Sequence, residues 1–294
     1  MTYALLIAAL GFTDLPVPTQ PDCPEIAEPI YDPVLGLPPA DTGARQVFHG
    51  HDYVSLYWAN EAAKAVKGAV VLDRIVDMPT WLYLHPGVLY TGGGLRRICG
   101  AYIPALAMTT ANPYPRGIVI DSVVFDGNWD TCGSAGDWRY DNALSIRGRN
   151  TVRNSVFVDS PSESITSCGA VLEGNVGWHL AGSFVHKSCA TGQQAADILV
   201  GNRVAGVNLL GDAGLGGHSE GAVTFSAAAG AILLMGNVFV DGLEGVYGVA
   251  DSQAEGVLAT GDCYQGFPRL LTYYDGARPE TFRFPGTRMV RVGL

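Results

Sequence analysis

The chain has 294 residues, of which 48% are apolar and only 16% are charged, and its formal net charge is −10. This composition is too apolar for a disordered protein and too poor in Lys and Glu for a helical bundle. The acidic balance argues against nucleic acid as a partner, because no basic patch is available to neutralise phosphates.

An apolar stretch, residues 4–10, lies near the start of the chain. No Lys or Arg precedes it and no Ala-x-Ala pattern follows before Asp14, so we do not interpret it as a secretion signal. We expect a buried strand or a short helix there. No run of 18 apolar residues occurs, so we expect no membrane-spanning helix and no membrane partner.

Residues 12–45 hold 8 of the 17 prolines, a density that forbids a helix or a central strand. The segment is either a disordered linker or an extended arm that becomes ordered against another surface. We expect residues 1–51 to form an N-terminal arm that docks on a neighbouring subunit or, through residues 12–45, on other proteins of a larger particle.

A helix is predicted over residues 52–67. Asp52 is a suitable N-cap, apolar residues recur along one side, and Gly68 ends the helix. Short strands punctuated by Pro and Gly follow at 69–72, 81–84 and 88–90.

A short sequence motif then recurs, in which a small residue and Asn lie between two short apolar strands. It surrounds Asn154, Asn175, Asn202 and Asn237. The steps of 21, 27 and 35 residues (175 − 154, 202 − 175, 237 − 202) indicate a solenoid of stacked β coils. We expect the four asparagines to align at one corner, because Asn tolerates left-handed backbone geometry and its amide can bond to the copies on either side.

The predicted helix, the strand at 67–72, the segment at 85–89 and the glycine-rich turn after it resemble the first coil of right-handed parallel β-helix proteins. That superfamily includes pectate lyases, polygalacturonases and bacteriophage tailspikes, in which a helix caps the open end of the core. The resemblance implies an all-β, right-handed, single-stranded parallel β-helix over residues 52–275. We expect residues 276–294 to form a C-terminal cap and residues 211–218 to form a protruding loop.

The six cysteines are widely spread and no CxxC pair occurs, so we expect no zinc site. An even number allows disulfides, but spacing cannot assign them. Buried free thiols are the simpler interpretation, because free Cys behaves as a small apolar residue.

Alignment of the repeats places polar side chains in two rows, since successive coils stack about 4.8 Å apart. The first row, four or five residues after each Asn or its counterpart, contains Asp126, Asp159, His179 and Asp241. The second row, nine to eleven residues after it, contains Glu163, His186, Lys187 and Tyr247.

These rows suit saccharide binding, because carboxylates and imidazoles hydrogen-bond hydroxyls and aromatic rings stack on sugar faces. The candidate binding residues are Asp126, Asp159, His179, Asp241, Trp178 and Tyr247, with Trp129 and Trp138 as further aromatic surfaces. If the protein is an enzyme, the candidate catalytic residues are Asp159, Glu163, Asp126, His186 and Lys187. Asp159 with Glu163, or Asp126 with Asp159, would supply the two carboxylates of a glycosidase. The alternative is that these polar residues face water and cap turn amides.

Residues 163–167 and 184–188 resemble the alginate lyase and chondroitinase B group, which carries Lys in the first segment and an Arg-His pair in the second. Here Thr166-Ser167 and His186-Lys187 stand in those places, and both departures argue against lyase activity. An acidic chain also repels a polyuronate unless cations such as Ca²⁺ intervene. His218-Ser219-Glu220 lacks a nucleophile elbow, and no His spacing indicates a metal site.

By resemblance to tailspikes, the leading hypothesis is a virion-type spike or tail protein that recognises a cell-surface glycan as a homotrimer. The alternative is a polysaccharide-degrading or -modifying enzyme, a hydrolase, lyase or epimerase, and a third option is a purely architectural particle component. We expect a location on a virion or an extracellular particle, with surface polysaccharide as partner and with no cofactor other than an optional Ca²⁺.

Overall fold

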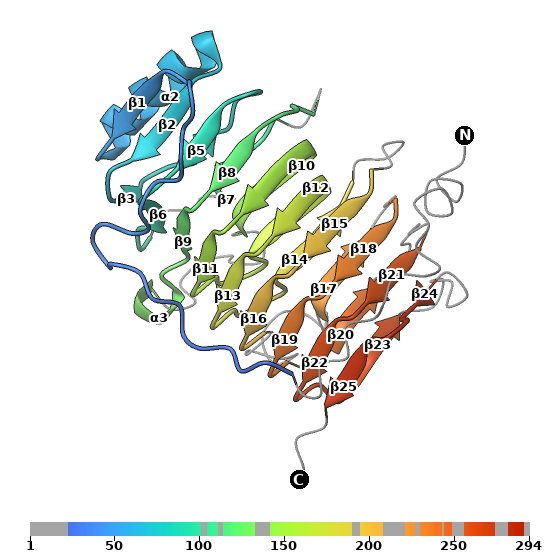
Figure 1. Ribbon diagram of the computed structural model, residues 1–294. Coiled ribbons are helices and arrows are strands. Elements are labelled where there is room, and N and C mark those ends of the chain that lie inside the picture. Colours follow the sequence, from blue (N-terminus) through green and yellow to red (C-terminus); the bar gives the residue numbers. More distant parts are fainter. Residues whose placement is uncertain are drawn as a thin grey trace, which may run out of the picture.

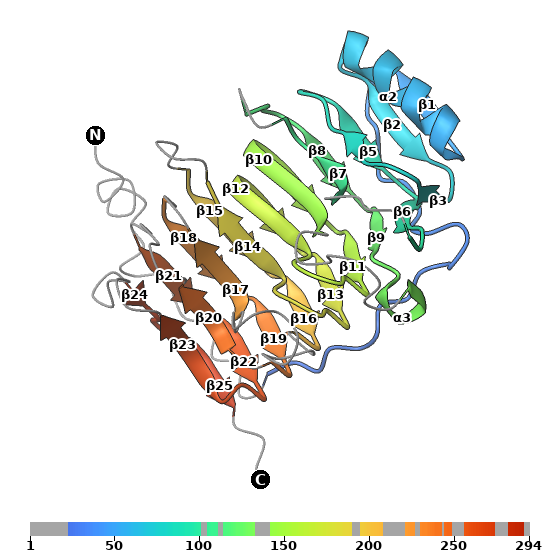
Figure 2. The ribbon, with the colours of Figure 1, turned by 180° about the vertical axis from the view of Figure 1, so that it is seen from behind.

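The computed structural model describes residues 23–100, 105–110, 114–132, 142–189, 195–207, 221–226, 230–242, 244–248, 256–273 and 282–290. In this part the chain winds into stacked coils (Figures 1 and 2). Strands at equivalent positions of successive coils pair in parallel, as β11 (Val156–Val158) does with β9 and β13. The predicted parallel β-helix is therefore present. The predictions for residues 4–10, the loop at 211–218, His218 to Glu220 and Trp138 lie outside the described residues.

Three faces of parallel strands run along the stack, and each coil contributes one strand to each face in turn. The first face contains β1 (Val47–Gly50), β2 (Ala69–Leu72), β5 (Leu89–Thr91), β8 (Val119–Asp121), the second halves of β10 (Asn142–Arg153) and β12 (Ile165–Glu173), β15 (Asp197–Val200), β18 (Ile232–Met235), β21 (Val257–Thr260) and β24 (Phe282–Arg283). The second face contains β3 (Ile75–Met78), β6 (Gly94–Arg97), β9 (Val124–Asp126), β11, β13 (Val176–Trp178), β16 (Arg203–Ala205), β19 (Val238–Val240), β22 (Cys263–Gln265) and β25 (Arg288–Val290). The third face contains β4 (Leu82–Tyr83), β7 (Ala105–Met108), the first halves of β10 and β12, β14 (Val185–Ser188), β17 (Gly221–Ser226), β20 (Glu244–Gly248) and β23 (Arg269–Tyr273).

The core fills the interior of the coils with apolar side chains that stack from one coil to the next. On the second face, the rings of Phe125 and Phe157 stack with centroids 4.9 Å apart, and those of Phe239 and Tyr264 stack at 5.0 Å. All four rings are essentially inaccessible to solvent. Each coil therefore buries its apolar surface mainly against its two neighbours, as repeat proteins do.

A ladder of buried amides stacks at the corner between the first and second faces. The side-chain oxygen of Asn202 accepts hydrogen bonds from the backbone N–H and the Nδ2 of Asn175, both at 3.0 Å. The side-chain oxygen of Asn237 accepts the two corresponding hydrogen bonds from Asn202. The Nδ2 of Asn202 also donates to the carbonyl of Leu172. Asp262 continues the ladder beyond Asn237. These hydrogen bonds satisfy amides that have no access to water.

Asn154 does not belong to this ladder, so the predicted alignment of four asparagines is wrong by one residue. Its neighbour Ser155 occupies the ladder position and donates its backbone N–H to the side-chain oxygen of Asn175. Asn154 has a φ of 50° and stands at the position that Gly174, with a φ of 60°, occupies in the next coil. The left-handed residue of this corner is thus Asn in one coil and Gly in later coils.

Helix α2 (Tyr53–Val66) closely matches its prediction. Asp52 accepts a hydrogen bond from the backbone N–H of Ser55, whose hydroxyl accepts one from the N–H of Asp52, which is a capping box. Leu56 and Ala63 are fully buried in the main core. The helix lies at one end of the stack, beside β1 and β2 (Figures 1 and 2). No helix among the described residues is long and apolar enough to cross a membrane.

The described part of the predicted arm, residues 23–45, runs along the outside of the second face of its own chain (Figure 1). The N–H of Ile75 donates to the carbonyl of Val34 at 2.8 Å, and Leu37 forms a β-bridge with Gly93. This part of the arm thus packs on its own subunit. Docking on a neighbouring subunit or on other proteins stays a prediction. Residues 12–22 lie outside the described part of the chain.

All six cysteines form disulfides, so the simpler interpretation of buried free thiols is wrong. The pairs are Cys23–Cys263, Cys99–Cys132 and Cys168–Cys189. Cys23–Cys263 spans 240 residues of sequence and ties the start of the described arm to β22. Loop-closure entropy over such a span corresponds to about 5 kcal/mol of stabilisation.

The sheets extend beyond the predicted limits of the solenoid. β1 pairs with β2, so the coils begin before residue 52. β24 and β25 pair with β21 and β22, so residues 282–290 continue the coils instead of forming a separate cap.

Candidate functional site

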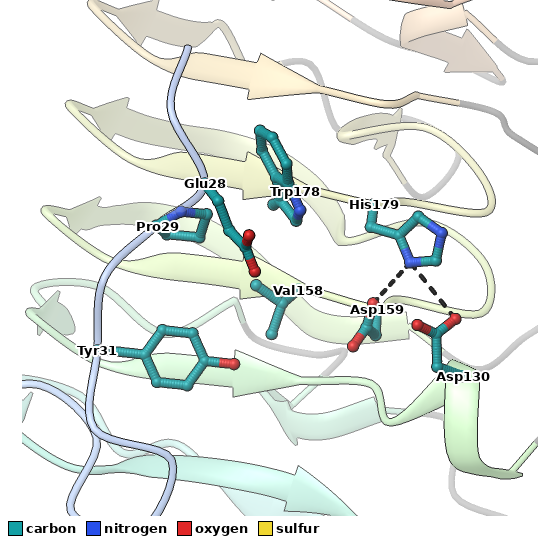
Figure 3. A pocket seen from close by; sticks show the side chains of 8 residues that line it. All are labelled: Glu28, Pro29, Tyr31, Asp130, Val158, Asp159, Trp178 and His179. Atoms are coloured by element: carbon teal, nitrogen blue, oxygen red, sulfur yellow. Dashed lines mark hydrogen bonds and ion pairs between the residues drawn. The ribbon is translucent and has the colours of Figure 1, made fainter.

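An open cleft of about 310 Å³ lies between the arm and the second face. The arm supplies one wall, the ends of β11 and β13 supply the floor, and the short helix α3 (Trp129–Cys132) supplies one end. The lining residues are Glu28, Pro29, Tyr31, Asp130, Val158, Asp159, Trp178 and His179 (Figure 3). The cleft thus gathers three carboxyl groups, an imidazole and two aromatic rings.

Asp159 and His179 occupy the same corner position in successive coils, directly after β11 and β13. Both have left-handed backbone geometry, with φ of 48° and 55°. The N–H of Asp159 donates to the carbonyl of Trp178, and the N–H of His179 donates to the carbonyl of Ala205 in the coil after it. Asp and His are among the residues that enter this region of φ most often. The corner therefore places the two side chains next to each other.

Three residues of the first predicted row, Asp159, His179 and Asp241, occupy equivalent positions in their coils, as predicted. Asp241 follows β19 with a φ of 53°, and Gly206 stands at the same position in the coil between it and His179. Asp126 lies one residue too early, since it pairs with Val158 across the strands. Neither Asp126 nor Asp241 lines the cleft.

The imidazole of His179 stands between two carboxyl groups. Its Nδ1 lies 2.8 Å from Asp159 Oδ1 and 3.5 Å from Asp130 Oδ1 (Figure 3). The ring of Trp129 approaches the imidazole at 5.4 Å between centroids. Helix α3 is held in place by the hydrogen bond from the N–H of Trp129 to the carbonyl of Asp159, and by the disulfide from Cys132 to Cys99.

The cleft shifts the protonation of its acidic groups. Burial raises the pKa of Asp159, and the negative charges of Asp130 and Glu28 raise it further, against the hydrogen bond from His179. Outside the cleft, burial also raises the pKa of Asp126, with a contribution from the negative charge of Asp159. Burial and the neighbouring carboxylates raise the pKa of Tyr31 to about 12. A carboxyl group that keeps its proton above the usual range is suited to acid catalysis.

Asp130, Asp159 and His179 offer ligand atoms that lie within 4.8 Å of one another, so one divalent cation could contact all three. Exposed acidic groups often lie this close without an ion. Nothing else among the described residues points to a metal here, and we assign none.

The second predicted row lies on the third face and is not a single site. His186 Nδ1 lies 2.8 Å from Glu163 Oε1, and Ser162 donates to the other oxygen. Burial favours the neutral form of Glu163, but the hydrogen bonds from His186 and Ser162 outweigh it and hold the pKa below its ordinary value. Glu163 does not line the cleft, so the structure does not bring it to Asp159 there as the second carboxylate.

Lys187 is fully buried, and its ammonium lies 3.0 Å from the carboxylate of Asp197, which is also inaccessible to solvent. A side chain with no access to solvent cannot reach a substrate, so the candidate catalytic role of Lys187 is not supported. The backbone of Tyr247 is two coils from His186 in the same register, through Thr224. The side chain of Tyr247 lies outside the described part of the chain.

Glu28, Tyr31 and Asp130 were not among the predicted site residues. The first two belong to the arm, for which no repeat pattern indicates a position, and Asp130 belongs to a short helix inserted between two strands. The aromatic Trp129 beside Asp130 was the one sequence signal near this part of the cleft.

No family model matches the chain, and no curated protein matches it. Among solved structures, the chain is similar to the A-module of the mannuronan C-5 epimerase AlgE4 from Azotobacter vinelandii. The match has 14% identity, covers 86% of this chain and 96% of that chain, and has a TM-score of 0.31. A likeness at this level carries no functional argument, and the fold assignment rests on the strand pairing described above.

Proposed function

We propose that the protein acts on polysaccharide and that the cleft between the arm and the second face binds part of the saccharide chain. The observation that carries this proposal is the combination of groups in one open cleft. The rings of Trp178 and Tyr31 offer surfaces on which sugar rings stack. The carboxyl groups of Glu28, Asp130 and Asp159 accept hydrogen bonds from sugar hydroxyls.

The charge of the cleft favours a neutral or amino-substituted saccharide over a polyuronate. No Lys or Arg is among the described lining residues, and the whole chain carries a charge of −10. Three carboxyl groups repel an anionic sugar, whereas they attract a protonated amine. This agrees with the absence of the lyase-type Lys and Arg-His pattern from the sequence.

Hydrolysis of a glycosidic bond is the reaction that these groups support best. Asp159, whose pKa is raised by burial and by its acidic neighbours, would protonate the leaving oxygen. Asp130, whose side chain is 63% exposed, would act as the second carboxylate. One oxygen of each carboxyl group lies within 4.8 Å of the other. This closeness suits the shorter carboxyl separation of retaining glycosidases, about 5–5.5 Å, and not the about 6.5–9.5 Å of inverting ones.

The test is product release from a panel of neutral, amino-substituted and uronate polysaccharides, with and without Ca²⁺. We expect reducing ends from a neutral or amino-substituted member, and we expect Asp159→Asn to reduce the rate at least about 100-fold while the chain still binds. Asp241→Asn is the matched control, because Asp241 has the same corner geometry outside the cleft. Equal loss in both variants, or no binding by the wild type, would refute the proposal.

Binding without turnover is the second candidate, as in the spike-protein hypothesis. The observation that favours it is the left-handed backbone of Asp159 and His179, which accounts for Asp and His at these positions without any catalytic role. In this case the wild type binds a surface glycan and releases no product. The homotrimer and attachment to a particle belong to this candidate.

Two further parts of the molecule fit either candidate. The three disulfides favour an oxidising, extracellular location. Helix α2 would close the end of the apolar core, because its buried residues belong to that core.

A further inference from the structure

Helix α2 exposes large apolar side chains to solvent, in addition to the apolar face that packs on the coils. Nine large apolar side chains are exposed among the described residues, and four of them lie on this helix: Val54, Tyr57, Trp58 and Val66. Trp58 is 66% exposed and Val54 is 63% exposed. Lys64 and Glu61 also lie on this helix, with side chains that are 52% and 36% exposed. The exposed apolar residues are nevertheless more than a surface helix with a single buried stripe requires.

The pattern of side chains on the exposed face is self-complementary. Val54, Trp58, Ala62 and Val66 follow one another at intervals of four residues and form a single ridge. The ridge has Val at both ends and one large and one small residue in the middle. A two-fold axis through its centre places Trp58 of each copy against Ala62 of the other, and Val54 against Val66. We propose that the outer face of α2 is a homodimer interface that joins two stacks end to end.

Charge supports a second copy of the chain as the occupant of this surface. Residues 45–74 have a net charge of 4 − 3 = +1, whereas the whole chain has a net charge of −10. The positive residues are Arg45, Lys64, Lys67 and Arg74, and the negative residues are Asp52, Glu61 and Asp73. Two copies of so acidic a protein repel each other over most of their surface. They meet without that repulsion at an end that is nearly neutral.

The same charge argues against a membrane surface as the occupant. Anionic lipid is recognised by clusters of about 4–8 Lys or Arg without compensating acids. Here Lys64 lies 3.4 Å from Glu61, which also contacts His85. Exposed aromatic side chains whose surroundings carry a net charge of only +1 suit a protein partner better than a lipid headgroup.

The size of the surface predicts a weak dimer. A helix of 14 residues is about 21 Å long, and one helix pair buries less than the roughly 1,200–2,000 Å² of a standard interface. The edge strand β1 adds Val47, which is 36% exposed. We therefore expect dissociation in the micromolar range, with a mass that depends on concentration.

The test is the mass of the full chain by sedimentation from about 1 to about 100 µM. We expect a shift toward twice the monomer mass, and we expect Trp58→Asp to weaken dimerisation at least about 30-fold, as loss of a central aromatic anchor does. Ala62→Trp should also weaken it, because the position must be small to receive Trp58. Leu35→Asp, at a side chain that is 57% exposed on the arm, is the control and should leave the mass unchanged.

Several outcomes would overturn the proposal. A wild-type monomer at every concentration would do so, and so would a trimer that is insensitive to Trp58→Asp. Tighter association of Ala62→Trp would indicate a non-specific apolar surface. Binding of a monomer to phosphatidylserine vesicles, lost in Trp58→Asp, would replace the second copy by a membrane surface. Far-UV circular dichroism of each variant checks that the fold is intact.

Discussion

Asp262 is the residue at which the buried ladder changes from an amide to an acid. Its Oδ1 accepts hydrogen bonds from the N–H and the Nδ2 of Asn237, while its Oδ2 has no partner among the described residues. Burial outweighs these hydrogen bonds and raises its pKa from 3.8 to about 7. The ladder therefore favours a neutral group at this position.

Replacement of Asp262 by Asn should make the protein more stable at high pH. In the wild type, the folded state holds the proton that the unfolded state has lost between the two pKa values, so stability falls as the pH rises from about 4 to about 7. The loss is on the order of 4 kcal/mol. An Asn side chain does not titrate, and its Nδ2 would donate to the carbonyl of Leu234, as Asn237 donates to Leu199.

Urea unfolding at about pH 5 and about pH 8 measures this effect. The stability of Asp262→Asn relative to wild type should be larger at the higher pH. A difference that is the same at both values would show that Asp262 is already ionised in the folded state at low pH.

At the scale of the elements, the arm is a strap that makes one wall of the cleft. It is fixed at one end by Cys23–Cys263 and at the other by the β-bridge from Leu37 to Gly93. The arm residues that line the cleft are Glu28, Pro29 and Tyr31, and they lie between these two anchors. Their position over the second face thus depends on a covalent bond that is remote in sequence.

The double replacement Cys23→Ser and Cys263→Ser should release this wall. We expect saccharide binding to weaken about tenfold, because residues that are no longer held in place lose entropy when they close on a ligand. Limited proteolysis should then cut within residues 24–31, and this readout does not require a known ligand. Cys168→Ser with Cys189→Ser is the control, since that disulfide joins β12 to the residue after β14 and neither cysteine lines the cleft. Intact binding and an uncut arm in the first variant would contradict the strap.

At the scale of the whole molecule, the sequence repeats made the coils predictable. They gave no position for the arm or for the disulfide that ties the arm to β22. The corner that holds Asp159 and His179 could be aligned from the sequence, because strands of successive coils keep their register. Glu28 and Tyr31 could not be placed, because a proline-rich segment without a repeat can lie on any surface. The bond from Cys23 to Cys263 spans 240 residues and follows from the fold alone.

The stack should lose its order from the C-terminal end first. Each coil is stabilised mainly by its two neighbours, and a terminal coil has only one. At the N-terminal end, α2 buries Leu56 and Ala63 against the core. At the other end, β24 and β25 pair on one side only within the described residues, and the amide ladder ends at Asp262.

Amide hydrogen exchange should therefore be fastest in β22 to β25 and slowest in β10 to β16. Removal of the Cys23–Cys263 bond, which ties β22 to the arm, should speed exchange in the last coils and leave β10 to β16 unchanged. Uniform protection along the chain, or fraying that starts at α2, would show that the ends are not stabilised in this way.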